Sequence, residues 1–355
     1  MIDWTASMQH TFEYYIVDPG TWKDMKRLNG VKSCTITRDS EAETLGHATF
    51  DLDESIGECY IRVYLVAIQN GVTEKIALGT FLALTPYSGF NGKMVTVSVD
   101  TYTPLIELKE KMPPIGYYIP KGYNILDQAY LLTRENVRAP VIKGKCDETV
   151  FSDFIADPSD TWISFLTDLL ANAKYKFALD ELGRIFFAPD QDTASLQAIW
   201  TYDDNNSSIL YPELGLDHDL YGIPNVVEIV YSDNNEYYHA RVVNDDPNSP
   251  VSTINRGREI IYRETDPNFI NDPREDHVYE RAKQLLRELS SLEYSVTYTH
   301  GYCPVGLGDC VRLNYSRAKP IGANGVKAKI ISQTIKCEPG CPVTEKAVFT
   351  NKLWR

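Results

Sequence analysis

The first hundred residues alternate between short runs of strand-forming side chains and turn signals. The runs are rich in Val, Ile, Thr, Tyr and Phe, and they read FEYYIV, VKSCTITR, HATFDL, ECYIRVYLVAI, KIALGTFLAL and MVTVSVDTY. Pairs such as Asn29-Gly30 and Asn70-Gly71 separate several of them, and such pairs favour tight turns between antiparallel strands. Several short strands joined by regular turns predict a small antiparallel barrel or sandwich.

A helix followed directly by a β-hairpin is predicted in the middle of the chain. In SDTWISFLTDLLANAKY the apolar residues recur at helical spacing, and Ser159 or Asp160 is the expected N-cap. The next run, YKFALDELGRIFFAP, predicts two strands around a turn at Asp180 to Gly183. Another helix is predicted over NILDQAYLLTREN, with Asn124 as its N-cap. Helices that cover a hairpin make a compact α+β unit.

Strand patterns return in the last third, interrupted by one helix. The strand-like runs include NVVEIVY, YYHARVV, LEYSVTYTH and VKAKIISQTIK, and the helix is expected at about 273–290. The fold class predicted is therefore α+β and β-rich. We expect a first β-barrel domain at 1–105, completed by strands near 222–242, an α+β insertion at 106–220, and a second β-barrel domain at 221–355.

Charge and hydropathy exclude two classes of partner. The net charge is -14, whereas sequence-independent binding to nucleic acid requires a basic surface. We therefore expect no specific nucleic-acid binding, although an acidic wall past which nucleic acid slides remains compatible with this charge. The N-terminus lacks a secretory signal, and no apolar run reaches the roughly 18 residues of a membrane span. Folding in a cytosol is expected.

The sequence carries no motif that defines a catalytic or cofactor site. HExxH, GxSxG and the phosphate-binding loop are all absent, and the 49 acidic residues offer too many carboxylate pairs to single one out. DHD at 217–219 is best interpreted as a solvated loop. We expect no catalytic residue, no cofactor and no metal. Zinc binding stays open for Cys303, Cys310, Cys337 and Cys341, because CEPGC has a plausible ligand spacing, whereas free thiols in a reduced compartment are favoured.

The run NDDPNSPVSTINRGREI, at 244–260, is the candidate interaction loop. It lacks the glycine and the terminal acid of a calcium loop, and its two prolines prevent a regular strand. Long ordered loops in compact domains are usually functional, and arginine is favoured at protein interfaces. We therefore predict an inter-subunit contact through Asp246, Asn248, Arg256 and Arg258. The alternative is a plain turn between strands.

The order of these parts resembles the phage tail hub, or baseplate hub, proteins. Three passages carry the resemblance: VSVDTYTPLIELK at the end of the first β region, TWISFLTDLLANAKYKFALDELGRIFFAP, and GIPNVVEIVYSDNNEYYHARVVNDDPNSPVSTINRGREIIYRE with the helix and YCPVGLGDCVRL that follow. Such hubs are similar to tail-tube proteins. The resemblance implies two tube-like β-barrels per chain and a homotrimer that matches a six-fold tube to a three-fold tip.

The resemblance also implies a position and a set of partners. The hub lies at the tail tip of the virion, is assembled in the bacterial host cytoplasm, and leaves a central conduit. Its expected partners are the tail tube or distal tail protein, the tape-measure protein, and spike, fibre or other baseplate proteins. Since the sequence ends soon after the second β region, a purely structural role is expected. The alternatives are a cell-wall or polysaccharide hydrolase and a carbohydrate-binding module of a tail tip.

Overall fold

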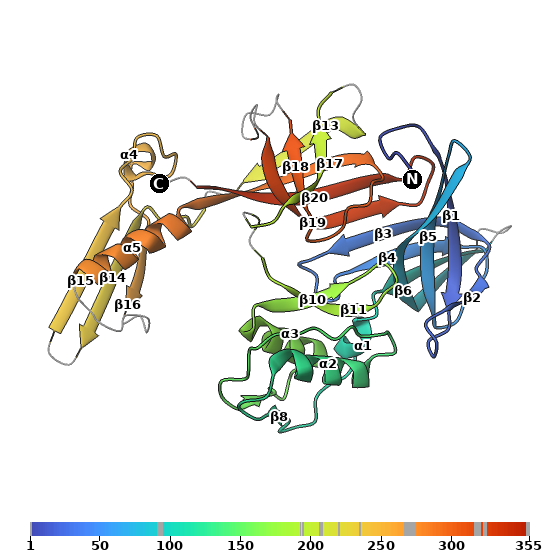
Figure 1. Cartoon of the computed structure of the whole chain (residues 1–355), viewed down its shortest axis with the longest axis horizontal. Helices are drawn as coiled ribbons and strands as arrows, with labels where there is room; N and C mark the ends of the chain where they lie inside the picture. Colours follow the sequence, from blue (N-terminus) through green and yellow to red (C-terminus); the bar gives the residue numbers. More distant parts are fainter. Residues whose placement is uncertain are drawn as a thin grey trace. The chain divides into compact units, whose positions relative to one another are not determined.

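The computed structural model describes residues 2–90, 95–191, 193, 195–205, 209–218, 221–233, 236–265, 275–315, 321 and 325–352 (Figure 1). Two compact units make up the chain, and neither is continuous in sequence. The first contains Met1–Leu214 and Tyr298–Ala347, and the second contains Gly215–Thr297 and Val348–Arg355. Among the described residues, no helix is long and apolar enough to span a membrane.

A large, mainly antiparallel sheet forms most of the first unit. Its N-terminal strands are β1 (Gln9–Val17), β2 (Asp24–Arg27), β3 (Val31–Asp39), β4 (Gly46–Leu52), β5 (Cys59–Gln69), β6 (Val72–Phe90) and β7 (Val95–Tyr102). Its later strands are β12 (Ala198–Asp203), β13 (Leu210–His218), β17 (Ser291–Gly301), β18 (Cys310–Asn314), β19 (Val326–Lys336) and β20 (Pro342–Lys352). The six strands predicted in the first hundred residues are all present, whereas the short, polar β2 was not predicted.

The hydrogen-bonded order of this sheet joins the two ends of the sequence. The order is β13-β17-β20-β19-β3-β4-β7-β6-β5-β1-β2, and β18 pairs with both β12 and β19. The link between the early and late strands is the antiparallel pair of β3 and β19, in which Ile36 lies opposite Ile335. Both residues are completely buried or nearly so, because alternate positions of each strand point into one apolar core.

The helices of the first unit pack with the predicted hairpin. This layer contains α1 (Ile106–Lys109), β8 (Tyr118–Ile119), α2 (Ile125–Asn136), β9 (Phe154–Ile155), α3 (Trp162–Asn172), β10 (Tyr175–Leu179) and β11 (Ile185–Pro189). Asn124 caps α2 as predicted, since its side chain accepts from the backbone N–H of Asp127 at 3.0 Å. The cap of α3 is Thr161 rather than Ser159 or Asp160, because Thr161 and Ser164 bond each other's backbone N–H in a reciprocal capping box.

The second unit contains a three-stranded sheet, one long helix and one short helical turn. Its elements are β14 (Val226–Asp233), β15 (Glu236–Val243), α4 (Thr253–Arg256), β16 (Ile261–Thr265) and α5 (Glu275–Leu289). The strand order is β15-β14-β16, and β14 runs parallel to β16. Val227 and Ile229 on β14 pack with Val278, Ala282 and Leu286 on α5, so the helix predicted at about 273–290 is present and buries one apolar face. The predicted residues 273 and 274 lie outside the described residues.

The β-rich α+β class is confirmed, but the compact units do not follow the predicted boundaries at 105 and 220. The strands near 222–242 pair with each other and with β16. The strand that extends the N-terminal part of the sheet is instead β19, through β3. Alternating apolar residues identify both segments as strands, yet they contain no information about the pairing partner. Within the described residues the strand order is a path with two ends, so closed barrels remain a prediction.

Candidate functional site

The predicted interaction loop follows β15 and folds back on itself. Asn244 is fully buried; its side-chain N–H donates to Ser249 Oγ at 3.0 Å, and its carbonyl accepts from Thr253 N at 2.9 Å. Ser252 caps the single turn of α4 by accepting from Asn255 N at 3.2 Å. Gly257, with φ of 61°, ends that turn. The loop is therefore an ordered segment stabilised by its own internal hydrogen bonds.

The four predicted interface residues have different local roles in this loop. Asp246 accepts two bonds from Asn248, one from the backbone N–H at 2.8 Å and one from the side-chain amide at 3.1 Å. Arg256 donates to the carbonyl of Ile223 at 2.9 Å. Arg258 is exposed, and its carbonyl accepts from the side chain of Asn225. The loop brings the four residues into one segment, and their contact with another subunit stays a prediction.

The four cysteines considered as zinc ligands belong to different local environments. Cys303 contacts Tyr202 in a polar cluster, and Cys310 begins β18. Cys337 and Cys341 pack in an apolar cluster that also contains Cys34. Among the described residues, no group of three or more His, Cys, Asp or Glu side chains is arranged to hold a metal ion.

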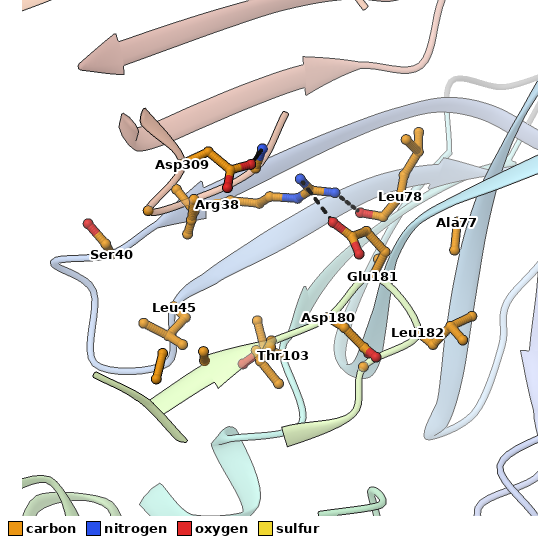
Figure 2. A pocket seen from close by; sticks show the side chains of 18 of the residues that line it. Arg38, Ser40, Leu45, Ala77, Leu78, Thr103, Asp180, Glu181, Leu182 and Asp309 are labelled. Atoms are coloured by element: carbon orange, nitrogen blue, oxygen red, sulfur yellow. Dashed lines mark hydrogen bonds and ion pairs between the residues drawn. The ribbon is translucent and has the colours of Figure 1, made fainter. Parts of the chain in front are cut away.

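A cavity of about 920 Å³ lies inside the first unit, where the sheet meets the β10–β11 hairpin. Its walls come from β3, β6, β10, β11, β19 and residues 302–309. The lining is largely apolar, and the charged side chains among it are Arg38, Lys75, Lys176, Asp180, Glu181, Arg184, Asp309 and Lys329. Figure 2 shows Arg38 extending between Leu78 on β6 and Glu181 in the hairpin turn, with Asp309 nearby.

Arg38 joins three segments around this cavity. Its guanidinium donates to the carbonyl of Leu78 at 2.6 Å and to Gln333 Oε1 on β19 at 3.0 Å. Glu181 Oε1 lies 3.9 Å from a guanidinium nitrogen of Arg38, and the Glu181 side chain is half exposed. This ion pair therefore contributes little to the stability of the fold by itself. Arg38 thus links β3, β6 and β19 through hydrogen bonds, and its charge also faces Glu181 in the hairpin turn.

A second arginine fixes the same hairpin turn. Arg62 on β5 is almost completely buried, and it donates to Thr80 Oγ1 at 2.9 Å, Asp24 Oδ1 at 2.9 Å and the carbonyl of Leu182 at 3.1 Å. Trp22 Nε1 donates to the same carbonyl at 2.7 Å. The turn carries Gly183, with φ of 74°, where an added Cβ would lie 2.7 Å from Thr80 Cβ. Only glycine fits both the backbone conformation and this close approach.

A buried polar cluster adjoins Arg38 through Gln333. Gln333 Nε2 donates to Glu345 Oε1 at 2.6 Å, and Tyr298 Oη donates to Glu345 Oε2 at 2.7 Å. His300 Nε2 lies 3.3 Å from Glu345 Oε1, and both side chains are completely buried. Tyr202 Oη lies 3.0 Å from His300 Nε2. The cluster therefore bonds side chains of β12, β17, β19 and β20 inside the sheet core.

The electrostatics of this cluster favour a charged pair. Burial by itself lowers the pKa of His300, but bonds to Cys303 and Glu345 and the Glu345 charge outweigh burial and raise that pKa to about 10. Burial opposes ionisation of Glu345, yet bonds from His300, Gln333 and Tyr298 lower its pKa below the ordinary value. A completely buried ion pair has no access to a substrate in solution, so the arrangement is suited to clamping strands together.

Sequence reasoning missed this cluster. Val296, Tyr298 and His300 lie on one face of β17, whereas Ser295, Thr297 and Thr299 lie on the other, so the pattern resembles an ordinary strand with one polar face. The available signal was the pair of polar side chains on one face, at i and i+2. Their burial depends on pairing with β20 and on Tyr202, which comes from a segment for which no strand was predicted.

Exposed apolar side chains gather around β8 and β9. Tyr118 lies directly opposite Ile155 in this two-stranded sheet, so both point to the same face, and both are exposed. Nearby in sequence, Ile115 is 92% exposed and Phe151 is 87% exposed. Apolar groups that remain open to water in such numbers are typical of surfaces that contact other proteins.

This chain is similar to known proteins in structure but has no match in sequence. No family model and no curated protein matches the sequence. A tail protein from Neisseria meningitidis has a TM-score of 0.63 at 11% identity, over 97% of this chain and 98% of that chain. The 43 kDa tail protein of prophage MuSo2 from Shewanella oneidensis has a TM-score of 0.61 at 12% identity, over 95% of this chain and 98% of that chain.

A further solved structure extends the likeness to a larger chain. A chain of the Francisella PdpA–VgrG complex has a TM-score of 0.55 at 10% identity, covering 96% of this chain and 52% of that chain. At sequence identities this low, the structural likeness shows a shared fold and nothing further. The protein therefore has the fold of phage tail proteins, and the resemblance to the tail hub family is confirmed at the level of the fold.

Proposed function

We propose that this chain is a structural hub at the tip of a phage tail or phage-tail-like particle. The observation that carries the proposal is the extent of the structural likeness, which covers 97% of this chain and 98% of the Neisseria tail protein. Nearly the complete architecture is shared, including the second unit and the helices beside the hairpin. A chain built throughout like a tail protein is best explained by a part in tail structure.

In this role the chain forms a homotrimer with two tube-like barrels per subunit. The trimer joins the six-fold tail tube or distal tail protein to a three-fold spike or fibre assembly, and it leaves a central conduit next to the tape-measure protein. The Francisella complex supports an adaptor that works within larger assemblies, because this fold occupies about half, 52%, of one chain there. The exposed apolar side chains around β8 and β9 support extensive protein contacts.

A role without catalysis accounts for the polar groups of the first unit. Arg38 and Arg62 bond backbone carbonyls and side chains of neighbouring segments, and His300 is paired with Glu345 out of contact with solvent. Each of these groups serves the packing of strands. We propose that the chain is a structural protein of the virion tail, assembled at the baseplate in the host cytoplasm.

Imaging of tail particles tests this proposal. Particles produced with an affinity-tagged chain are expected to carry the tag at one tip of the tail, in three copies around the axis. Particles produced without the chain are expected to lack the tip assembly. A tag along the tail shaft, or complete tips in its absence, would contradict the hub role.

Two measurements on the purified chain separate the competing functions. Light scattering is expected to give a trimer when the partner proteins are present, and a stable dimer would count against the three-fold arrangement. A gel containing bacterial cell walls is expected to remain opaque around the refolded chain. Clearing of that gel would favour a hydrolase instead.

A further inference from the structure

Cys34 and Cys337 face each other across two paired strands. The register of β3 with β19 places Ile36 opposite Ile335 and Thr35 opposite Lys336, so Cys34 and Cys337 form the next pair. Cys337 N donates to the carbonyl of Cys34 at 2.9 Å. Directly opposite residues of antiparallel strands have Cα atoms about 4.5 to 5.5 Å apart, which lies within the range that a disulfide requires.

The two thiols also point into the same apolar core. Cys34 and Cys341 are buried members of this core, and the half-buried Cys337 packs against it. Burial raises the pKa of the Cys34 thiol, and the neighbouring Cys337 thiol raises it further. All three cysteines are free thiols. Proximity, orientation and a path to solvent through Cys337 are therefore present before any oxidation takes place.

We propose that Cys34 and Cys337 are an oxidation site, at which a disulfide forms across β3 and β19 when the protein meets a small-molecule disulfide. The Cys337 thiolate attacks one sulfur of the small disulfide, and one small thiol leaves. The Cys34 thiolate then attacks Cys337 Sγ in the mixed disulfide, and the second small thiol leaves. The two cysteines are oxidised, the small disulfide is reduced to two thiols, and the two cysteine protons end on those thiols.

Burial determines the order and speed of these steps. Burial raises the pKa of the Cys34 thiol, and burial likewise raises the pKa of Cys341. The thiolate is the reacting form, so the step that needs Cys34 is slow at neutral pH and accelerates as pH rises. Cys341 is the competing partner, although it lies in the turn after β19 and has no position opposite Cys337 in a strand pair.

The bond would join a strand near the start of the sequence to a strand near its end. A disulfide that closes a very long loop restricts the unfolded chain strongly and so favours the folded state. The linkage also crosses the only pairing that connects the early and late strands along the described sheet order. Oxidation would therefore fix the two halves of the sheet to each other. This consequence does not depend on the proposed hub function.

Peptide mapping of the full chain tests the proposal. The reduced protein is incubated with oxidised glutathione at mildly alkaline pH, digested without reduction and analysed by mass spectrometry. The expected product is a pair of peptides joined through Cys34 and Cys337, with a mass two hydrogen atoms below the sum of the two reduced peptides. The Tm should rise as well, and dithiothreitol should reverse the rise. Cys34→Ser should stop the reaction at the glutathione adduct of Cys337, whereas the control Cys146→Ser should leave the cross-link unchanged.

Two outcomes would overturn the proposal. One is a stable glutathione adduct on Cys337 of the unaltered protein with no internal cross-link. The other is a Cys337–Cys341 disulfide in place of the predicted bond. Because both readouts come from the unaltered chain, the test remains decisive even if Cys34→Ser folds poorly, and Cys34→Ala provides a second, apolar replacement.

Discussion

His300 and Glu345 carry opposite charges where no solvent reaches either side chain. Moving two charges out of water costs several kcal/mol per ion, and this cost is offset only where bonds satisfy both groups. Tyr202, Tyr298 and Gln333 supply such bonds here. Removing one partner of such a pair typically costs about 3 to 5 kcal/mol, because the remaining charge stays buried alone.

The pair should give the protein a defined pH dependence of stability. The pKa of His300 rises from 6.5 to about 10 on folding, so its contribution is complete below pH 6.5 and is lost as pH rises through about 10. The pKa of Glu345 falls below 4.5, so its contribution is present above pH 4.5 and is lost on acidification through the lowered pKa. The Tm is therefore expected to be highest between pH 4.5 and 6.5 and to decline on either side.

Glu345→Gln tests whether this dependence belongs to the pair. The variant keeps the size of the side chain but removes its charge, so the free energy of unfolding should fall by about 3 to 5 kcal/mol, and the decline above pH 6.5 should flatten. Glu338→Gln in the nearby turn alters an exposed carboxylate and should change neither property. A decline of equal slope in Glu345→Gln and the unaltered protein would assign the pH dependence to other groups.

At the scale of single elements, the turn between β10 and β11 is constrained by its contact with the sheet. Gly183 and Gly116 both have positive φ, 74° and 79°, but only Gly183 has neighbours where a Cβ would lie. Alanine at either position should cost about 1 to 2 kcal/mol for the left-handed backbone. Gly183→Ala should cost a further 1 to 3 kcal/mol, roughly, because the added methyl meets Thr80.

Urea unfolding of the two glycine variants measures this difference directly. Trp22 provides a local probe, since its ring lies 3.3 Å from the position of the added Cβ. We expect its fluorescence to change in Gly183→Ala and to remain constant in Gly116→Ala. Equal losses of stability in the two variants would mean that the turn moves away from the sheet without cost.

The loop at 244–260 requires its two arginines to be tested separately. Arg256→Ala removes a bond to the carbonyl of Ile223 and should lower the free energy of unfolding by about 1 kcal/mol. Arg258→Ala alters an exposed side chain and should change stability by less than about 0.5 kcal/mol. If the loop contacts another subunit, Arg258→Ala should reduce the trimer fraction in light scattering while the Tm stays constant. An unchanged trimer fraction would make the loop a plain turn.

Sequence patterns predicted elements better than they predicted pairing. The runs around Val97 and Val99 and the stripe on α5 identify their elements because burial repeats along the chain with a fixed period. The pairing of β3 with β19, and the cluster around His300, depend on contacts between distant segments. Polar residues that become buried through such contacts look like surface residues in the sequence. The loop at 244–260 was recognised, whereas the cavity beside Arg38 was not.

At the scale of the whole molecule, the net charge of -14 opposes binding to nucleic acid. Binding to DNA gains most of its free energy by releasing cations from the phosphates, and an acidic protein has few groups to replace them. In a mobility-shift experiment at physiological salt, the purified chain should leave duplex DNA unshifted. A single-stranded control should behave in the same way. A shift that weakens with added salt would reveal a basic surface hidden in the total charge.

The larger segment of the second unit, Gly215–Thr297, lies between two neighbouring strands of the sheet order. β13 leads into it and β17 leads out of it, and these two strands are adjacent in the sheet order. Gly215–Thr297, the larger segment of the second unit, is therefore an insertion between two strands that pair in the sheet. Because the entropy of closing a loop grows only slowly with its length, accessory parts at this point can be enlarged, shortened or exchanged during evolution with little thermodynamic penalty to the sheet. The sheet can therefore keep its strand order while the segment inserted between β13 and β17 varies in length.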